Sequence, residues 1–235
     1  GDDGGIDVKH LQQELKARAN RKYKIGAFSA ASNITGIVCN TSYISHLLHS
    51  HNAIAIFDYA CAGPYEAIDV NATTYTCPNT GEVVVDRNCY MDAVILSPHK
   101  FVGGPQTPGV LVLNRKLFGE DEASHAPPAP ASAGGGTVFF VTERDHRYLK
   151  NVEDREEGGT PGIVESVRCG LAFRLKDAVS TAVIERREEE IMQKISKVWA
   201  GVDNLLLLGP SCEVAARRLP IFSFLIRAHG RYLHY

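Results

Sequence analysis

The chain has 235 residues, of which 44% are hydrophobic, and its formal net charge at pH 7 is −2. That length is enough to bury the core of one large domain, or of one domain and part of another. A near-neutral charge gives no support for nucleic acid or for an anionic membrane surface as a partner, and no apolar run approaches the roughly 20 residues of a membrane span. We therefore expect neither partner.

The apolar pattern alternates between short continuous runs and stretches with helical spacing. The two stretches with helical spacing in the first half predict helices at 6–19 and 41–50. The continuous apolar runs predict buried strands at 24–29, 53–57, 93–96 and 109–113. Buried strands separated by helices are typical of a mostly parallel sheet covered on both faces, so the predicted fold class is α/β.

The second half of the chain is predicted to be mainly helical. Residues 119–137 are rich in Ala, Pro, Ser and Gly, which indicates a mobile loop. Thr160, followed by a proline, is typical of a helix start, and from Ile163 an apolar residue recurs at every fourth position. A further helix at 183–200 carries the charged run Arg186–Glu190, which we interpret as a solvated face.

Two domains, both incomplete, are expected. Strand-like runs at 205–208 and 221–226 follow the last helix and indicate a second unit. We expect residues 1–185 to form a large domain without its N-terminal part, and residues 186–235 to begin a smaller α+β domain that is truncated.

Polar residues follow three of the predicted strands at their carboxyl ends, where open parallel sheets bind ligands. Asn33 follows the first, Asp58 closes the second, and Ser97, His99 and Lys100 follow the third. An aspartate directly after five apolar residues is costly to bury unless a cation or a hydrogen-bond donor meets it. A lysine on the neighbouring strand with a partly desolvated amine has a lowered pKa and can form an imine.

Four motifs in this order resemble those of class V aminotransferases, the group that includes cysteine desulfurases and selenocysteine lyases. They are similar to the family's Ser-Asn-x-Thr-Gly turn, aspartate strand, cofactor-lysine segment and Gly-Thr turn, and they lie at Ser32–Gly36, Phe57–Ala60, Ser97–Pro105 and Glu157–Pro161. The resemblance implies the fold type I architecture of pyridoxal 5′-phosphate (PLP) enzymes, with residues 1–185 as the PLP-binding large domain.

The resemblance also implies roles for individual residues. Lys100 would form the Schiff base with PLP and then shuttle the proton at the substrate α-carbon. Asp58 would keep the pyridine nitrogen protonated, which makes the ring an electron sink. Asn33 would lie near the ring hydroxyl or the substrate. Cys61 stands where desulfurases usually carry a glutamine that contacts the ring hydroxyl, so that contact is in doubt.

The remaining implied contacts concern the phosphate. Ser97 and His99 would hold it, and Thr160 would reach the phosphate of a neighbouring subunit, which implies a homodimer with shared sites. Simpler roles stay open, because Thr160 also suits a helix cap and Asn33 a plain turn. The run Gly134–Thr137 lacks the lysine of a P-loop and is interpreted as a flexible connector.

No metal site is expected. No two cysteines form a CxxC pair. Three histidines in and directly after the second predicted helix lack a completing ligand at metal spacing, so we interpret them as helix-surface residues: His46, His49 and His51. Unpaired cysteines indicate a reducing compartment, with the cytoplasm expected and the mitochondrion as the alternative.

Three functions fit these observations. The first is PLP-dependent cleavage of the C–S or C–Se bond of a small amino acid, as in desulfurases. The second is a PLP-dependent aminotransferase, and the third is a non-catalytic scaffold that keeps the fold. The resemblance places the ring-stacking residue, the carboxylate-binding arginine and the desulfurase cysteine loop outside residues 1–235, so this chain alone could be inactive.

Overall fold

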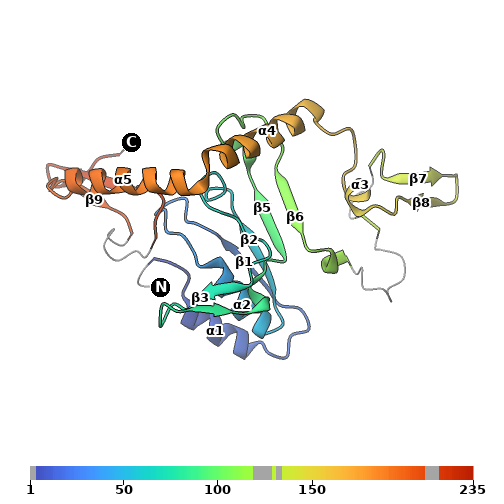
Figure 1. Ribbon diagram of the computed structural model, residues 1–235, viewed down its shortest axis with the longest axis horizontal. Helices are drawn as coiled ribbons and strands as arrows, with labels where there is room; N and C mark the ends of the chain where they lie inside the picture. The colour runs from blue at the N-terminus through green and yellow to red at the C-terminus, as the bar shows by residue number, and fades with distance from the viewer. Residues whose placement is uncertain (1–3, 119–128, 131–133, 210–216, 235) are drawn as a thin grey trace.

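The centre of the molecule is a four-stranded sheet with the order β1-β2-β5-β6, shown in the computed structural model of residues 4–118, 129–130, 134–209 and 217–234 (Figure 1). Its strands are β1 (Ile25–Ser29), β2 (Ile54–Asp58), β5 (Ala93–Leu96) and β6 (Val110–Leu113). The first three are parallel, and β6 runs antiparallel to β5. The predicted α/β class is confirmed, and each of these strands lies within one residue of its predicted bounds.

Helices α1 (Val8–Ala17) and α2 (Thr41–Ser50) cover one face of this sheet. Asn40 starts α2, because its side chain accepts a hydrogen bond from the Tyr43 N–H. Leu48 of α2 is 1% exposed and packs directly over Gly26, where a Cβ atom would lie 2.5 Å from the leucine side chain. Glycine at this position therefore lets the helix approach closely enough to bury a leucine, which contributes about 2 kcal/mol.

The opposite face of the sheet is open along one row. Ser29, Asp58, Ile95 and Leu111 are register partners across the four strands, so their side chains share a face. Ile95 is 43% exposed and Leu111 is 59% exposed. A polar residue placed in this row therefore faces outward.

A short hairpin that the sequence analysis did not predict packs on α2. It consists of β3 (Thr74–Thr76) and β4 (Val83–Val85), paired antiparallel. Its Tyr75 ring stacks on His46 of α2 with 4.6 Å between ring centroids. The hairpin was not predicted because each of its strands has only three residues, which are too few to show the alternation of apolar and polar residues typical of a strand.

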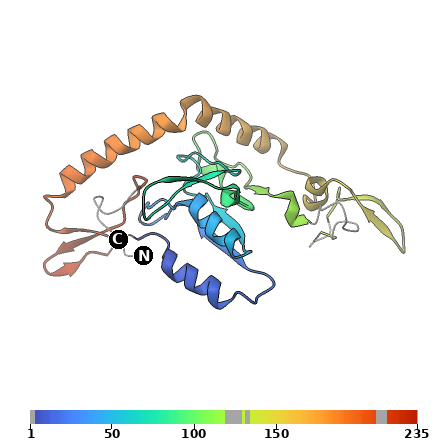
Figure 2. The same cartoon turned by 60° about the horizontal axis from the view of Figure 1, so that its bottom comes forward.

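The second half of the chain forms an arch of two helices over the sheet (Figure 2). The helices are α4 (Ile163–Val179) and α5 (Thr181–Trp199), and a short helix, α3 (Val152–Glu156), precedes them. The remaining strands form a hairpin before α3 and a three-stranded antiparallel sheet after α5: β7 (Val138–Val141), β8 (His146–Tyr148), β9 (Leu205–Leu207), β10 (Phe224–Ala228) and β11 (Arg231–Tyr232).

Several predictions for this half need correction. Helix α4 begins at Ile163 with Gly162 as its N-cap, so the prediction that Thr160 caps it is wrong. The helix cannot begin at Pro161, because the backbone of Gly162 has a ψ angle of 88°, which is not helical. Strand β10 starts three residues later than predicted. Of the loop predicted at 119–137, residues 119–128 and 131–133 lie outside the described residues.

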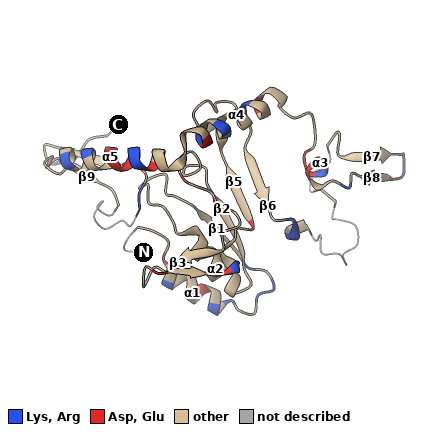
Figure 3. Cartoon of the chain, viewed as in Figure 1, with Lys and Arg blue, Asp and Glu red and all other residues tan. Residues whose placement is uncertain are grey.

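Charged residues attach α5 to the body of the molecule. Nη2 of Arg217 lies 2.7 Å from Oε1 of Glu185 on α5 and 3.0 Å from Oε2 of Glu66 in the loop after β2. Burial and the nearby Glu66 carboxylate raise the pKa of Glu188 to about 7. Acidic and basic residues lie along α5 (Figure 3); of the run Arg186–Glu190, predicted to be a solvated face, Arg186, Arg187 and Glu189 are exposed, whereas Glu188 and Glu190 are half-buried.

Within the described residues, no helix is both long and apolar enough to cross a membrane. The same part of the chain holds no group of histidine, cysteine and carboxylate side chains arranged for a metal ion.

His49 is largely enclosed, with its side chain 10% exposed, rather than on the helix surface, which corrects the prediction. Its Nε2 lies 2.8 Å from Oδ2 of Asp92 and its Nδ1 lies 2.8 Å from the Asn88 carbonyl oxygen. Both partners are acceptors, so the imidazolium form, with a proton on each ring nitrogen, satisfies both contacts. Although burial lowers the pKa of His49, the bonds to Asp92 and Asn88 outweigh it and raise that pKa above its ordinary value.

We expect this pair to make folding stability depend on pH. Because the pKa of His49 is raised, its contribution is complete below about pH 6.5 and is lost as the pH rises through the raised pKa. The pKa of Asp92 is lowered by the His49 and Ala55 bonds despite burial, so its contribution is lost only in acid. His49→Gln should cost about 1–3 kcal/mol at pH 6 and flatten the decline in Tm between pH 6 and pH 9.

Thermal unfolding across that pH range measures both effects. His51→Gln, two residues further along, is the matched control and should keep the wild-type pH profile. An unchanged profile in His49→Gln would show that the ring is not charged in the folded protein.

Candidate functional site

The parallel register places the carboxyl ends of three strands level with one another. Ser29 of β1 pairs with Asp58 of β2, and Asp58 pairs with Ile95 of β5. The backbone bonds continue just beyond the strands, since the Ala30 N–H donates to the Asp58 carbonyl at 2.9 Å and the Tyr59 N–H donates to the Ile95 carbonyl at 2.8 Å. We call this edge, with the loops that leave it, the rim.

Asp58 lies at the centre of the rim. Its Oδ1 accepts a hydrogen bond from the Ala60 N–H at 2.7 Å, which turns the chain immediately after the strand. The prediction that this carboxylate is buried is wrong, because Asp58 belongs to the open row of the sheet and its side chain is exposed.

Lys100 follows β5 at the same edge. The segment Pro98–Lys100 forms one turn of 3₁₀-helix, closed by the Lys100 N–H bonding to the Ser97 carbonyl at 3.0 Å. Ser97 is half-buried and its hydroxyl makes no capping bond to this turn. The side chains of His99 and Lys100 are exposed, so the expected partial desolvation of the lysine is not found.

Cys61 connects the two loops electrostatically. Its thiol is half-buried and donates to the Ala31 carbonyl at 3.0 Å. Burial raises the pKa of this thiol, the Lys100 ammonium opposes that rise, and the Asp58 carboxylate adds to it. The charges of Lys100 and Asp58 therefore act on the same sulfur atom, which brings these three predicted residues into one environment.

Asn33 lies in the turn that leaves β1 at the rim. The turn is held by the Ser32 hydroxyl, which accepts the Thr35 N–H at 3.1 Å, and by Gly36 at φ +74°. Asn33 itself is exposed at the turn. Because Ala31 contacts Cys61, this turn lies beside the other two loops.

Thr160 does not belong to the rim cluster. It is exposed on the segment that joins α3 to α4, and Figure 1 shows α3, β7 and β8 extending beyond the sheet on the side of β6. In this extension Gly158 packs so closely on Gly134 that a Cβ atom on Gly134 would lie 2.7 Å from the Gly158 Cα. The Gly159 N–H also donates to the Gly135 carbonyl at 2.8 Å, so the glycine run packs against the Gly-Thr turn.

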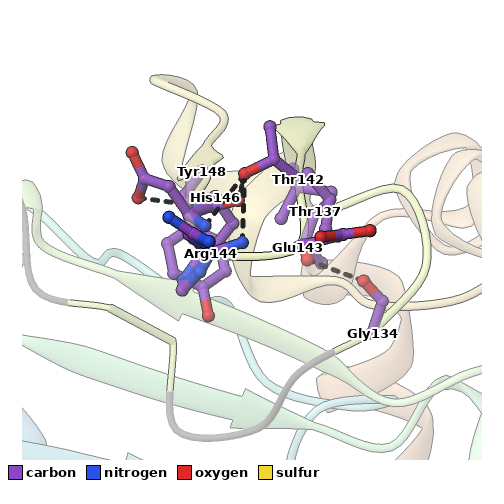
Figure 4. A pocket seen from close by; sticks show the side chains of 10 residues that line it. Gly134, Thr137, Thr142, Glu143, Arg144, His146 and Tyr148 are labelled. Atoms are coloured by element: carbon purple, nitrogen blue, oxygen red, sulfur yellow. Dashed lines mark hydrogen bonds between the residues drawn. The ribbon is translucent and has the colours of Figure 1, made fainter.

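A hollow of about 640 Å³ lies at the β7–β8 hairpin (Figure 4). The Thr142 hydroxyl accepts the Asp145 N–H at 2.9 Å and orders the hairpin turn, while the Thr137 hydroxyl donates to the Gly134 carbonyl at 2.7 Å. Other lining residues include Arg144, His146 and Tyr148. No predicted site residue lines this hollow, so it is separate from the rim.

Sequence reasoning missed the residues that support the rim from α4. Nη1 of Arg168 donates to the Pro105 carbonyl at 3.0 Å, and Nζ of Lys176 donates to the Gly63 carbonyl at 2.7 Å. Lys176 follows Cys169, Ala172 and Phe173 at intervals of seven, four and three residues, which is the spacing of one helical face. A single lysine on a helical face that is otherwise apolar is the sequence signal that could have identified Lys176 as a supporting residue.

Similarity to known proteins covers nearly the whole chain. The family model described as Aminotransferase class-V matches residues 1–77 and 79–233. Probable cysteine desulfurase 2 of Mycobacterium leprae is 26% identical over 209 residues, which are 89% of this chain and 43% of that protein. A probable cysteine desulfurase of Halalkalibacterium halodurans is 26% identical over 208 residues, 88% of this chain and 44% of that protein. The chain thus spans less than half the length of these relatives.

Solved structures share the fold. A cysteine desulfurase from Escherichia coli superposes with a TM-score of 0.70 at 18% identity, covering 93% of this chain and 46% of that one. The apo structure of a cysteine desulfurase from Thermococcus onnurineus NA1 gives a TM-score of 0.69 at 19% identity. The superposition covers 98% of this chain and 49% of that one. At such identities the likeness establishes the fold, and the predicted architecture is confirmed.

The shared environment of Cys61 can be tested by its alkylation rate. Because the thiolate is the reactive form, Lys100→Met should raise the thiol pKa and slow alkylation at pH 7.5, whereas Asp58→Asn should lower that pKa and speed alkylation, each by about two- to threefold. Mass spectrometry of the Cys61 peptide during iodoacetamide treatment measures the rate.

Cys77 provides an internal reference for the same digest. A hydrogen bond with Thr80 lowers the pKa of its thiol, and it lies in the separate loop between β3 and β4. Its rate should be the same in all three proteins. Changes of the same sign at Cys61 in both variants would contradict the arrangement.

Proposed function

The chain belongs to the class V aminotransferase family, and from this premise we propose that the complete protein is a PLP-dependent enzyme that cleaves the C–S or C–Se bond of cysteine or selenocysteine. The observation that carries the proposal is the rim, where the parallel register sets Asp58 of β2 beside Ile95 of β5 and Lys100 follows β5 at the same edge. The names of the similar proteins, which are cysteine desulfurases, support this reaction over transamination.

The side chains of the rim fit the chemical groups of PLP. An exposed primary amine, Lys100, suits the aldehyde carbon, and an exposed carboxylate, Asp58, suits a protonated pyridine nitrogen. The hydroxyl of Ser97 and the imidazole of His99 are the donors that a phosphate needs, and they flank the single turn before Lys100. These four residues would hold the cofactor, with Asn33 and Cys61 beside it.

The family's cofactor, when bound, supplies a ring that takes up electrons released at the substrate α-carbon. Lys100 would hold the aldehyde carbon of the cofactor and would carry the α-proton of the substrate on its amine. Asp58 would keep a proton on the pyridine nitrogen, and the Ala60 N–H bond to its Oδ1 fixes the orientation of that carboxylate. Cys61 presents a thiol kept neutral by burial, which avoids adding an anion beside Asp58.

We further propose a homodimer in which Thr160 serves the phosphate of the partner's site. Its exposure on the segment beyond β6, outside the rim of its own chain, supports that assignment. A reducing compartment such as the cytoplasm is proposed on the cysteines, none of which forms a disulfide among those described by the structure.

The first test concerns Lys100 in the complete protein. Wild-type protein mixed with PLP should develop a visible imine band that borohydride removes, and peptide mass should locate the reduced adduct on Lys100. Lys100→Ala should lose the band entirely, because no amine remains to form the bond. A full band in this variant would refute the assignment. Formation of alanine from cysteine, with the sulfur collected as sulfide by an added thiol reductant, separates desulfuration from transamination, which would instead yield an oxo acid.

The second test concerns Asp58. Asp58→Asn should keep the fold, since an exposed residue is changed to one of the same shape, but turnover should fall by at least about a hundredfold because the ring loses its electron sink. Cofactor affinity should weaken as well. Activity with cysteine and the absorbance titration measure the two effects, and full activity of Asp58→Asn would exclude the pyridine role.

A further inference from the structure

We propose that Lys176 of α4 is a positioning residue, which fixes the loop that carries Asp58 relative to the segment that carries Lys100. This inference rests on the proposed function, because it assigns Lys176 a part in the same site. Lys176 acts on Asp58 and Lys100 indirectly, through the backbone of the loop after β2 and through the ring of Phe101, the residue after Lys100.

The first attachment is to the loop after β2. Nζ of Lys176 donates to the Gly63 carbonyl at 2.7 Å and to the Glu66 carbonyl at 2.5 Å. That loop is a series of tight turns, because the Gly63 N–H bonds to the Tyr59 carbonyl at 2.7 Å and the Glu66 N–H to the Ala62 carbonyl at 2.9 Å. The ammonium therefore holds the far end of the turns that begin at Asp58.

The second attachment is to the segment after β5. The same Nζ lies 5.6 Å from the ring centroid of Phe101, the residue after Lys100. Phe101 is 4% exposed, and its ring packs against Phe173 of α4 with 4.8 Å between centroids. A Cβ atom on Gly63 would lie 3.3 Å from this ring, so the two loops contact each other beneath the lysine.

The ammonium of Lys176 lies in a half-buried place beside a carboxylate. Burial lowers the pKa of its ammonium, and the nearby Glu66 carboxylate counteracts that effect. Glu66 is in turn held by Arg217, whose Nη2 lies 3.0 Å from Oε2. Removing the ammonium would leave the Gly63 and Glu66 carbonyls without this donor, which destabilises the loop beyond the loss of one bond.

Asp58 and Lys100 need such a link because Asp58 is the last residue of β2 and Lys100 lies in the segment after β5, so the sheet does not fix the loop after β2 relative to the backbone of Lys100. Productive geometry requires catalytic groups to be held within about 0.5 Å, and a shift of 1 Å can cost about a hundredfold in rate. The sheet register aligns β2 with β5 only as far as Asp58 and Ile95. Beyond that point Lys176 and Phe101 join the two loops on the inner side of α4.

The matched experiment compares Lys176→Met with Arg174→Met in the complete protein. Both changes replace a cation of α4 by methionine, but Arg174 is exposed and lies on the outer side of the helix. Hydrogen exchange without cofactor, the PLP dissociation constant, Tm, and the pH midpoint of the visible band are measured. Lys176→Arg, which keeps the charge, is the rescue variant.

We expect Lys176→Met to speed hydrogen exchange by about tenfold in two peptides, residues 60–66 and 101–104, with little change in the sheet. PLP binding should weaken by about tenfold, as for one lost charged hydrogen bond, and the pH midpoint of the band should move. Arg174→Met should match wild type, and Lys176→Arg should recover at least part of the loss.

Three outcomes overturn the inference. One is faster exchange in only one of the two peptides, and another is unchanged exchange in both. The third is a uniform rise in hydrogen-exchange rate across the chain with a lower Tm but with wild-type PLP affinity and pH midpoint, which would indicate a purely structural role.

If Lys176→Met does not fold, Lys176→Gln is judged by the same criteria. Absence of a visible band in wild type would defeat the proposed function, while the exchange data would still decide whether Lys176 joins the loops.

Discussion

The alignment of three parallel strands at their carboxyl ends is the constraint on which the rest of the structure depends. A shift of β2 by one residue would turn Asp58 from the open row to the face covered by α2, because side chains alternate between faces. The register is held from that covered face, where Phe57 is fully buried and Gly26 admits Leu48. Apolar packing on one side of the sheet therefore determines where charged groups stand on the other.

The rim could be predicted from the sequence because each of its residues is located by the local sequence pattern alone. Continuous apolar runs identify the strands, and the first polar residue after each run lies at an end that parallel strands share. Exposure could not be predicted in the same way. Asp58 and Lys100 were expected to be partly buried, but burial depends on what covers the row containing Ile95 and Leu111, and no local pattern encodes that.

Helix α4 illustrates a related limit of periodicity. Ile163, Val167 and Leu171 recur at helical spacing and correctly predict a helix, yet they are 66%, 61% and 58% exposed. The buried face of the helix is formed instead by smaller residues, of which Cys169 is 6% and Ala172 is 3% exposed. A period identifies an apolar face but not the surface that the face meets. Hence the inward lysine on the opposite side of α4 escaped sequence reasoning, although it contacts both loops of the rim.

The openness of the rim affects how the site can work. In water, two unit charges 4 Å apart interact with an energy of about 1 kcal/mol. At an effective dielectric constant of 20, the interaction energy of the same pair is about 4 kcal/mol. Under the proposed role, Asp58 would hold a proton on a cofactor nitrogen strongly only where water is excluded, so the open row containing Ile95 would have to be covered for that chemistry. Geometry and electrostatics thus have separate sources in this protein. The sheet register, together with Lys176, places the charged groups. The strength of the electrostatic interactions that these groups make depends on what covers the open face of the sheet.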